Sequence, residues 1–163
     1  MDTLLPRAAR AADLLRARGE TLATGEGSVG GLVSAALIAQ AGASAYFLGG
    51  TIVYTRQGAR ALRDRATLDL AGLAPFTPAF VQELADGLRR QTKADWTTSE
   101  MGAAGPAPSP YGPAAGTAVI AVSGPVARAI LVETGSDDRI ANMRAFGRAT
   151  LDLLIACLEE ASE

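Results

Sequence analysis

Apolar and polar residues alternate along this chain with two different periods. Leucine and alanine recur against arginine and aspartate at helical spacing, whereas shorter apolar runs rich in β-branched and aromatic residues are typical of strands. Gly19 ends the first helical pattern, and Thr77 followed by Pro78 is a favourable start for a later helix. The predicted helices cover residues 3–18, 33–41, 57–65, 77–92 and 139–160. The predicted strands cover residues 21–24, 51–55, 96–100, 117–123 and 128–134.

The order of these elements predicts the fold class. Strands alternate with helices early in the chain, and Gly124 with Pro125 joins the last two strands as an antiparallel hairpin. This order favours an α/β protein, a three-layer α/β/α sandwich in which helices cover both faces of a mixed sheet. At 163 residues we expect a single domain over residues 1–163. The glycine- and proline-rich stretch 102–116 is expected to be a lid or binding loop, with a plain surface excursion as the alternative.

A glycine-rich turn over residues 25–31 follows the first predicted strand and leads directly into a helix. Such a turn presents backbone N–H groups and the positive end of a helix dipole to an anion. Glycine allows a close approach of ligand or a turn at positive φ. We therefore predict a small-molecule site for a phosphate or carboxylate around this turn, with a tight turn that binds no ligand as the alternative.

The same turn formally matches a dinucleotide-binding fingerprint, Gly25-x-Gly27-x-x-Gly30. That fingerprint also requires an acidic residue at the end of the second strand, where this chain continues Tyr54-Thr55-Arg56. An arginine there could accept a 2′-phosphate, so an NADP-linked activity stays open as an alternative. The turn is not a P-loop, because no Gly-Lys-Ser/Thr follows.

Composition excludes several kinds of chemistry. The chain has no histidine, which excludes Ser-His-Asp and Cys-His catalysis and histidine-ligated metals, and we expect neither a metal nor a cofactor. Lys93 is the single lysine, so any serine–lysine mechanism would have to use it. Cys157 is the single cysteine and lies in an apolar helical stretch, where an inert buried thiol is expected.

Charge and hydropathy also limit the partners. A net charge of −2 with scattered arginines gives no reason to expect nucleic-acid binding. The chain has no apolar run of the roughly 20 residues that a membrane span needs, and its first residues do not resemble a signal peptide. We therefore expect a cytoplasmic protein that does not associate with membranes.

Several short motifs follow one another along the chain in a specific order and spacing. These motifs are Glu26-x-x-x-Gly30-Gly31, Gly42-Ala-Ser-Ala-Tyr-Phe-x-Gly-Gly, Val53-Tyr54-Thr55 followed by Arg60-Ala-Leu, Ala104-Gly105-Pro106, Gly116-Thr117 and Asp138-Arg139. Together they resemble the CinA-type competence/damage-inducible family, in particular its C-terminal domain, and the resemblance extends from about residue 8 to residue 158. Stand-alone members of that family include nicotinamide mononucleotide deamidases, so the resemblance implies a related α/β fold and carboxamide hydrolysis.

The chain departs from the deamidase pattern at the positions that would carry the chemistry. In the deamidases the loop resembles Ala-Glu-Ser-Cys-Thr-Gly-Gly, with the serine as the expected nucleophile; Gly27 takes that place here and Ser28 takes the place of the cysteine. Ala59 stands where a lysine is expected. Met143 replaces a second arginine, and Arg144 follows it.

Three residues are candidates for catalysis, each with a structural alternative. Ser28 could act as a nucleophile if the turn were shifted in register, or it could be a helix N-cap. Tyr54 could donate a hydrogen bond or act as a base, or it could be a buried core residue. Glu26 could orient a ribose hydroxyl or a catalytic water, or it could only cap the helix.

A larger set is expected to bind the ligand. Arg139, in the first turn of the last helix, is the leading candidate for contacting an anion, and Arg60 is either a second one or an exposed helix residue. The pocket would be formed by residues 25–31, 54–60 and 102–106 and the start of the last helix. The candidate ligand-binding residues are Gly27, Gly30, Gly31, Thr55, Arg60, Ala104, Gly105, Arg139 and Arg144.

Two functions are consistent with these residues. The resemblance implies a nicotinamide-nucleotide amidase, which converts nicotinamide mononucleotide to the acid form and ammonia. The alternative is a catalytically silent or altered nucleotide- or phosphate-binding protein of the same fold. In both cases the expected partner is a phosphorylated, nucleotide-like small molecule, and alanine-rich helices such as 33–41 favour a homo-oligomer.

Overall fold

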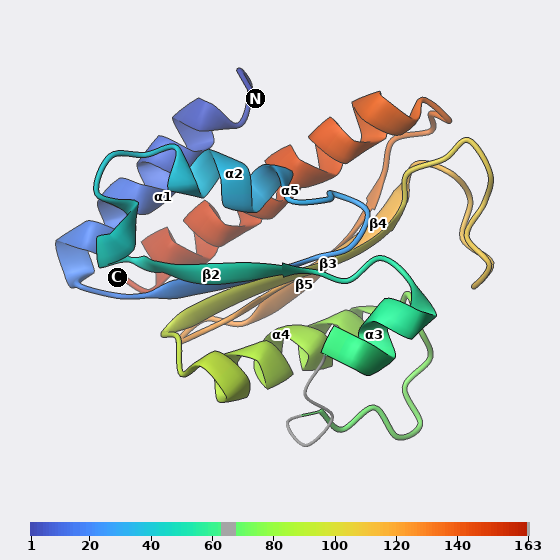
Figure 1. Cartoon of the computed structure of the whole chain (residues 1–163), viewed down its shortest axis with the longest axis horizontal. Coiled ribbons are helices and arrows are strands. Elements are labelled where there is room, and N and C mark those ends of the chain that lie inside the picture. The colour runs from blue at the N-terminus through green and yellow to red at the C-terminus, as the bar shows by residue number, and fades with distance from the viewer. Residues whose placement is uncertain (63–67, 163) are drawn as a thin grey trace.

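The computed structural model describes residues 1–62 and 68–162, and it arranges them in three layers (Figure 1). A five-stranded sheet forms the middle layer, in the order β2-β1-β3-β4-β5. The strands are β1 (Leu22–Glu26), β2 (Phe47–Ile52), β3 (Trp96–Ala103), β4 (Thr117–Ser123) and β5 (Arg128–Glu133). The helices are α1 (Leu5–Arg18), α2 (Leu32–Ile38), the 3-10 turn η1 (Ala43–Ala45), α3 (Arg56–Leu62), α4 (Pro78–Thr92) and α5 (Arg139–Glu160).

The sheet is mixed, and α1, α2 and α5 cover one face while α3 and α4 lie on the other (Figure 1). Strand β1 pairs in parallel with β2 and β3, whereas β3–β4 and β4–β5 are antiparallel. The predicted three-layer α/β/α class and the late hairpin are therefore confirmed. Because the three parallel strands end at one edge, the segments that follow them come together there, where α/β proteins usually bind ligands.

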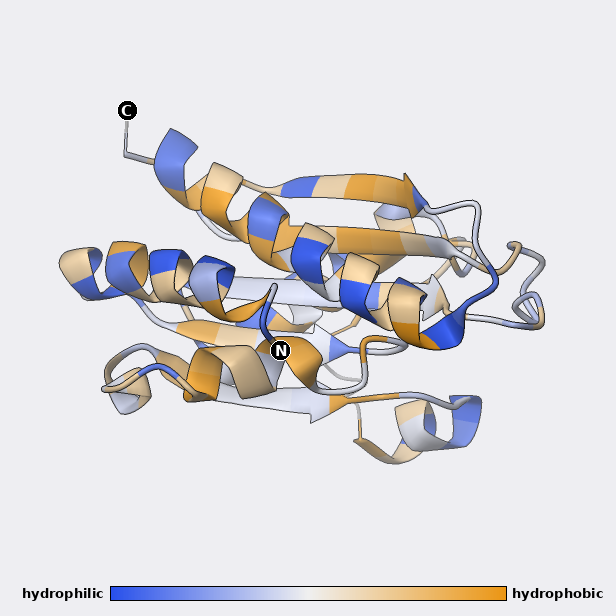
Figure 2. Cartoon of the chain, turned by 90° about the horizontal axis from the view of Figure 1, so that it is seen from above, coloured by the Kyte–Doolittle hydropathy of each residue, from blue (hydrophilic) through white to orange (hydrophobic). Residues whose placement is uncertain are grey.

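Apolar side chains fill both spaces between the layers. The larger cluster lies under α1, α2 and α5 and includes the fully buried Leu15, Trp96 and Phe146. The smaller cluster lies under α4 and includes Val81 and Val119. Hydrophilic and hydrophobic residues alternate along the ribbon of the C-terminal helix (Figure 2), which is the pattern of a helix with one face on a sheet. Within the described part of the chain, no helix is both long and apolar enough to cross a membrane.

The predicted helix starts at 77 and 139 are confirmed by their capping contacts. Thr77 accepts a hydrogen bond from the Phe80 N–H at the start of α4. Asp138 accepts one from the Ala141 N–H at the start of α5. Both helices then end where the sequence pattern predicted, at Thr92 and Glu160.

The second strand was predicted at 51–55, and this is wrong, because β2 spans Phe47–Ile52 and runs through the Gly49-Gly50 pair. Glycine reads as a turn residue in sequence, but here packing requires it: a Cβ on Gly50 would lie 2.5 Å from Thr24 Oγ1. Other elements differ only in length. Helix α2 ends at Ile38, β3 continues to Ala103, and residues 63–65 of the predicted helix lie outside the described residues.

Candidate functional site

The glycine-rich turn connects β1 to α2 through two consecutive residues in the left-handed region. Gly30 has φ +68° and Gly31 has φ +95°, conformations that a side chain would strain. Gly31 is the residue that precedes α2, and it makes no side-chain cap. The first turn of α2 therefore depends on another part of the chain for hydrogen-bond acceptors.

Glu26, at the end of β1, supplies those acceptors. Its carboxylate accepts hydrogen bonds from the N–H groups of Gly31 (2.8 Å), Val33 (3.2 Å) and Ser34 (2.7 Å), and from the Ser34 hydroxyl. The residue is only 3% exposed. Two roles were considered for Glu26, orienting a ligand or water and capping the helix. These contacts are those of a cap, because both carboxylate oxygens accept hydrogen bonds from the start of α2.

A second buried carboxylate, Glu100 of β3, fills the other half of the turn. It accepts hydrogen bonds from the N–H groups of Gly27 and Val29, each at 3.0 Å, and from the Ser28 hydroxyl at 2.5 Å. Burial raises the pKa of Glu100, and the negative charge of Glu26 adds to the rise, while the three hydrogen bonds oppose it. The turn thus lies between two carboxylates of the same chain.

This arrangement changes the interpretation of the turn. The sequence predicted that its N–H groups face an external anion, but five of those around the turn donate to Glu26 or Glu100. Ser28 does not cap α2, contrary to the alternative offered for it, because α2 begins only after Gly31 and the Ser28 hydroxyl donates to Glu100. Ser28 is 4% exposed, so its hydroxyl is buried under the turn.

Gly27, in the place of the expected nucleophile, lies tightly against β3. A Cβ added there would be 2.9 Å from the Glu100 carbonyl oxygen, closer than real Cβ contacts come. The turn therefore has no room for a side chain at position 27 unless β1 and β3 move apart. The path of the backbone therefore favours glycine at this position, where the deamidase pattern has a serine.

A different cluster forms where the segments that follow β2 and β3 meet the start of α5. The Arg139 guanidinium donates to the Gly105 carbonyl oxygen through Nη1 and to the Tyr54 hydroxyl through Nη2, both at 2.7 Å, and lies 5.7 Å from the centre of the Tyr54 ring. Tyr54 is 63% exposed, which overturns the alternative that it is a buried core residue. Three of the predicted site residues are thus in direct contact.

Asn142, one turn into α5, holds the neighbouring loop in place. Its amide donates to the carbonyl oxygens of Ala104 and Ser136 at 2.9 and 2.8 Å, and its own oxygen accepts from the Thr134 hydroxyl. Asn142 is 1% exposed. The predicted residue Ala104 is buried and takes part in this site through its backbone.

The remaining predicted residues lie further from this cluster or play local roles. Thr55 accepts a hydrogen bond from the Gly58 N–H and so caps α3. Arg60 is exposed on α3, which agrees with the alternative that it is an exposed helix residue. Met143 faces the turn, with its methyl 3.3 Å from where a Cβ on Gly30 would lie, whereas Arg144 is exposed one residue further round α5. Arg56, which the sequence offered only as a contact for a 2′-phosphate, donates to the Tyr111 hydroxyl at 2.9 Å.

Glu100 and Asn142 are two important residues that sequence reasoning missed. Glu100 gave one usable signal, since it is a charged residue in a run of otherwise uncharged residues predicted to be a strand. Such a charge needs partners inside the protein. Asn142 gave no comparable signal, because a polar residue early in a helix is usually exposed.

Fold and site together define an α/β protein with a cluster of polar groups at the carboxyl ends of its parallel strands. The family model described as "CinA C-terminal domain" matches residues 5–158. The chain therefore belongs to the CinA C-terminal domain family, as the resemblance indicated.

Relatives and solved structures agree with this assignment. A CinA-like protein of Prochlorococcus marinus (strain MIT 9313) is 40% identical over 113 residues, which are 69% of this chain and 26% of that protein. One of Anaeromyxobacter dehalogenans (strain 2CP-C) is 34% identical over 137 residues, 81% of this chain and 33% of that protein. The chain thus spans between a quarter and a third of the length of these relatives.

Among solved structures, the chain is similar over its whole fold to proteins of about its own length. A competence-damaged protein (CinA) superfamily protein from Klebsiella pneumoniae 700603 superposes with a TM-score of 0.84 at 28% identity, covering 96% of this chain and 98% of that one. The competence damage-inducible protein A (ComA) from Klebsiella pneumoniae subsp. pneumoniae MGH 78578 gives the same TM-score and identity, covering 96% and 97%.

Proposed function

We propose that this chain binds a phosphorylated, nucleotide-like small molecule at the carboxyl edge of its parallel strands and does not hydrolyse it through a serine nucleophile. The observation that supports binding is the state of Arg139. Its guanidinium is oriented by two neutral oxygens, those of Gly105 and Tyr54, and within the described residues no carboxylate pairs with it.

An arginine held in this way is suited to recognising phosphate. The guanidinium has five N–H donors in a rigid fork, and two of them are used, so the others can donate to an anion. The neutral acceptors orient the side chain without cancelling its charge. Tyr54 adds a hydroxyl and an exposed ring beside it, which suits a ligand that carries both a phosphate and a flat ring.

The case against hydrolysis comes from the groups that a serine–lysine mechanism needs. Ser28 is buried with its hydroxyl on Glu100, and position 27 cannot accept a side chain. Ala59 occupies the expected lysine position. The chain's single lysine, Lys93, follows α4 and precedes the start of β3, which places it at the opposite edge of the sheet.

Carboxamide hydrolysis, as in a nicotinamide-nucleotide amidase, is the second candidate, and one observation favours it. The Ser28 hydroxyl donates to a carboxylate whose pKa is raised, which is the arrangement of a nucleophile and its base. In that mechanism the Ser28 oxygen attacks the amide carbon, Glu100 takes the hydroxyl proton and returns it to the departing ammonia, and water then releases the acid. The turn would have to open for the substrate to reach Ser28.

One experiment compares the two candidates. Nicotinamide mononucleotide is titrated into the purified full chain by calorimetry, and ammonia release is followed in parallel. We expect saturable binding without turnover, weakened about tenfold or more in Arg139→Ala, because a charged hydrogen bond is lost. Arg148→Ala, on the same helix, is the matched control and should leave the affinity unchanged.

Two results would overturn this proposal. Ammonia release that disappears in Ser28→Ala would establish the amidase instead. Affinity that is equal in the parent chain and in Arg139→Ala would show that the anion is not bound at this cluster.

A further inference from the structure

Strand β2 forms one edge of the sheet (Figure 1). On its inner side it pairs with β1, and the register is regular from the pair Ala23 and Gly49 to the pair Glu26 and Ile52. On its outer side it pairs with no strand of the described chain. An edge of this kind presents a row of unpaired N–H and C=O groups, which is a template for pairing with another strand.

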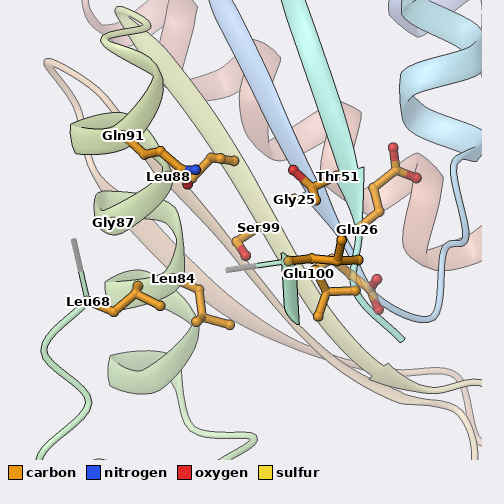
Figure 3. A pocket seen from close by; sticks show the side chains of 12 residues that line it. Gly25, Glu26, Thr51, Leu68, Leu84, Gly87, Leu88, Gln91, Ser99 and Glu100 are labelled. Atoms are coloured by element: carbon orange, nitrogen blue, oxygen red, sulfur yellow. The ribbon is translucent and has the colours of Figure 1, made fainter. Parts of the chain in front are cut away.

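The exposed residues of β2 lie on the side of the sheet that carries α2. Exposed and half-buried residues alternate along the strand, and Leu48, Gly50 and Ile52 are the exposed ones. Thr51, between the last two, lines a small cavity on the α4 side of the sheet (Figure 3). Because successive side chains of a strand point to opposite faces, the exposed three point to the α2 side. A Cβ on Gly50 would indeed lie 2.2 Å from Ser34 Oγ of α2.

Helix α2 extends this apolar face. Ile38 lies one turn after Ser34, and hence on the same side of the helix. Ile38, Leu48 and Ile52 are 60%, 52% and 49% exposed. We call the β2 edge patch the surface formed by Ala35, Ile38, Leu48, Gly50 and Ile52. Single exposed apolar side chains are ordinary on a protein surface, whereas a group of neighbouring ones marks an interaction site.

The β2 edge patch carries no charge, and neither do the residues around it in sequence. Residues 27–55 contain no Asp, Glu, Lys or Arg, although these four make up 20% of the chain. Burial does not account for the missing charges, because Ala39, Ser44 and Tyr54 of this segment are exposed as well. The exposed side of α1, by contrast, carries Arg7 and Arg10, which form ion pairs with α5.

The opposite edge of the sheet is built differently. Strand β5 begins at Arg128 and ends at Glu133, both exposed, and Arg128 forms an ion pair with Glu160. Charged residues on an edge strand are one way in which proteins prevent it from pairing with another chain. The edge at β2 lacks this protection, so β2 is the edge that is suited to pairing.

The charge and size of this surface favour a second copy of the chain as the partner. In a two-fold symmetric contact the same patch is used by both subunits, so any charged residue near the axis would face a like charge. A surface without charge meets its own copy with no such repulsion. The uncharged segment 27–55 also has about the length of the 20–30 residues that each side of a stable interface contributes.

We propose that two copies of this chain form a symmetric dimer through antiparallel pairing of their β2 strands, which buries the β2 edge patch between them. A two-fold axis next to Gly50 places Leu48 opposite Ile52 of the partner subunit and brings the two α2 helices together on one side of a continuous sheet. The chain runs from β2 directly to Tyr54, which contacts Arg139, so this interface adjoins the candidate binding site. The pairing does not depend on a ligand there.

Sedimentation velocity of the purified full chain over a series of concentrations measures its mass. We expect a species of twice the 16.6 kDa of the chain. Leu48→Lys should weaken the dimer at least about tenfold, because a lysine on an edge strand opposes pairing and its charge would have to be buried. Leu131→Lys is the matched control, since Leu131 is a 55% exposed leucine on the other edge strand, and it should leave the dimer unchanged.

Ile38→Lys, at the exposed end of α2, should weaken the dimer as well, and it keeps the test decisive if Leu48→Lys fails to fold. A double variant, Leu48→Cys with Ile52→Cys, tests the register. A short bis-maleimide should link it into a covalent dimer, whereas Leu48→Cys alone should not be linked, because its two copies lie about 13 Å apart along the paired strands. Cys157 is buried and does not compete for the reagent.

Three results would overturn the proposal. The first is a chain that stays monomeric at every concentration. The second is a dimer that both lysine variants leave intact. The third is equal cross-linking of Leu48→Cys alone and of the double variant, which would exclude the antiparallel register.

Discussion

The turn after β1 and the loop after β3 lie at the same edge of the sheet, and both are rich in glycine, yet they use their hydrogen-bonding groups in opposite ways. The turn directs five N–H groups at Glu26 and Glu100, so its anions come from the chain itself. The loop offers its Gly105 carbonyl oxygen to Arg139, and no carboxylate of residues 1–62 and 68–162 pairs with that arginine. An anion-binding shape is therefore no evidence of an open anion site until the nearby carboxylates are located.

The two regions should also respond differently to substitution, the turn through stability and the Arg139 cluster through ligand binding. At the turn, both carboxylates are buried and their hydrogen bonds are buried or partly buried, so changes there should act mainly on folding. At the Arg139 cluster, the side chains are partly or largely exposed, so changes there should act mainly on ligands. The four predictions below test this separation, beginning with the largest effect.

Glu26→Ala should cause the largest loss of stability, about 4 kcal/mol in the free energy of unfolding. Three N–H groups and the Ser34 hydroxyl would lose their acceptor, a carboxylate that is only 3% exposed. Guanidinium unfolding measures the loss, and Glu133→Ala, an exposed position, serves as the control with an expected change below about 0.5 kcal/mol. A loss below about 1 kcal/mol would mean that the turn does not need its internal anion.

Gly102→Ala should destabilise the protein by about 2–3 kcal/mol through overpacking. The added Cβ would lie 2.2 Å from Ser28 Oγ, 2.5 Å from Glu100 Oε1 and 3.1 Å from Phe146. Unfolding of Gly102→Ala in a Ser28→Ala background should recover part of that loss, because the nearest atom is removed. Additive effects of the two substitutions would contradict the packing of Ser28 against β3.

Glu100→Gln should keep the fold and change how stability depends on pH. The amide oxygen can still accept from Gly27 and Val29, while its NH2 group can donate to Ser28. Because the folded pKa of Glu100 is raised above the ordinary 4.5, the parent chain should lose stability as pH rises from that value to the folded pKa.

Melting temperatures across that range provide the measurement for Glu100→Gln. The variant should lack the part of the decline that belongs to Glu100, so the two stability curves should converge at low pH and separate as pH rises. Parallel curves would show that Glu100 titrates normally in the fold.

Arg139→Lys should have the smallest effect on stability, within about 1 kcal/mol, while it weakens binding of nicotinamide mononucleotide several-fold. Lysine keeps the charge but loses the planar fork that bonds Gly105, Tyr54 and an anion together. Calorimetry of the ligand and thermal unfolding of the same samples separate the two effects. A variant that loses stability but keeps its affinity would reverse the roles assigned to the two regions.

The linear pattern of residues was sufficient for the class of fold and for most element ends. Helical spacing and caps are local properties, so Gly19, Thr77 and Asp138 marked their helices correctly. The resemblance motifs also indicated the family and brought Tyr54, Gly105 and Arg139 into one candidate site. What failed locally was the Gly49-Gly50 pair, where packing against Thr24 and Ser34 outweighed the turn preference of glycine.

Which groups of the site are paired, buried or exposed was decided only by the tertiary structure. Glu100 is 73 residues from Gly27 in sequence, yet it supplies the acceptor for the turn, and no local pattern of the turn itself could reveal this. The burial of Glu100 and the exposure of Tyr54 likewise depend on which strands pair and which helices cover them. The sequence by itself determined where strands, turns and helices form; the tertiary structure decided which buried charges meet which N–H groups, because burial and pairing are properties of distant segments brought together.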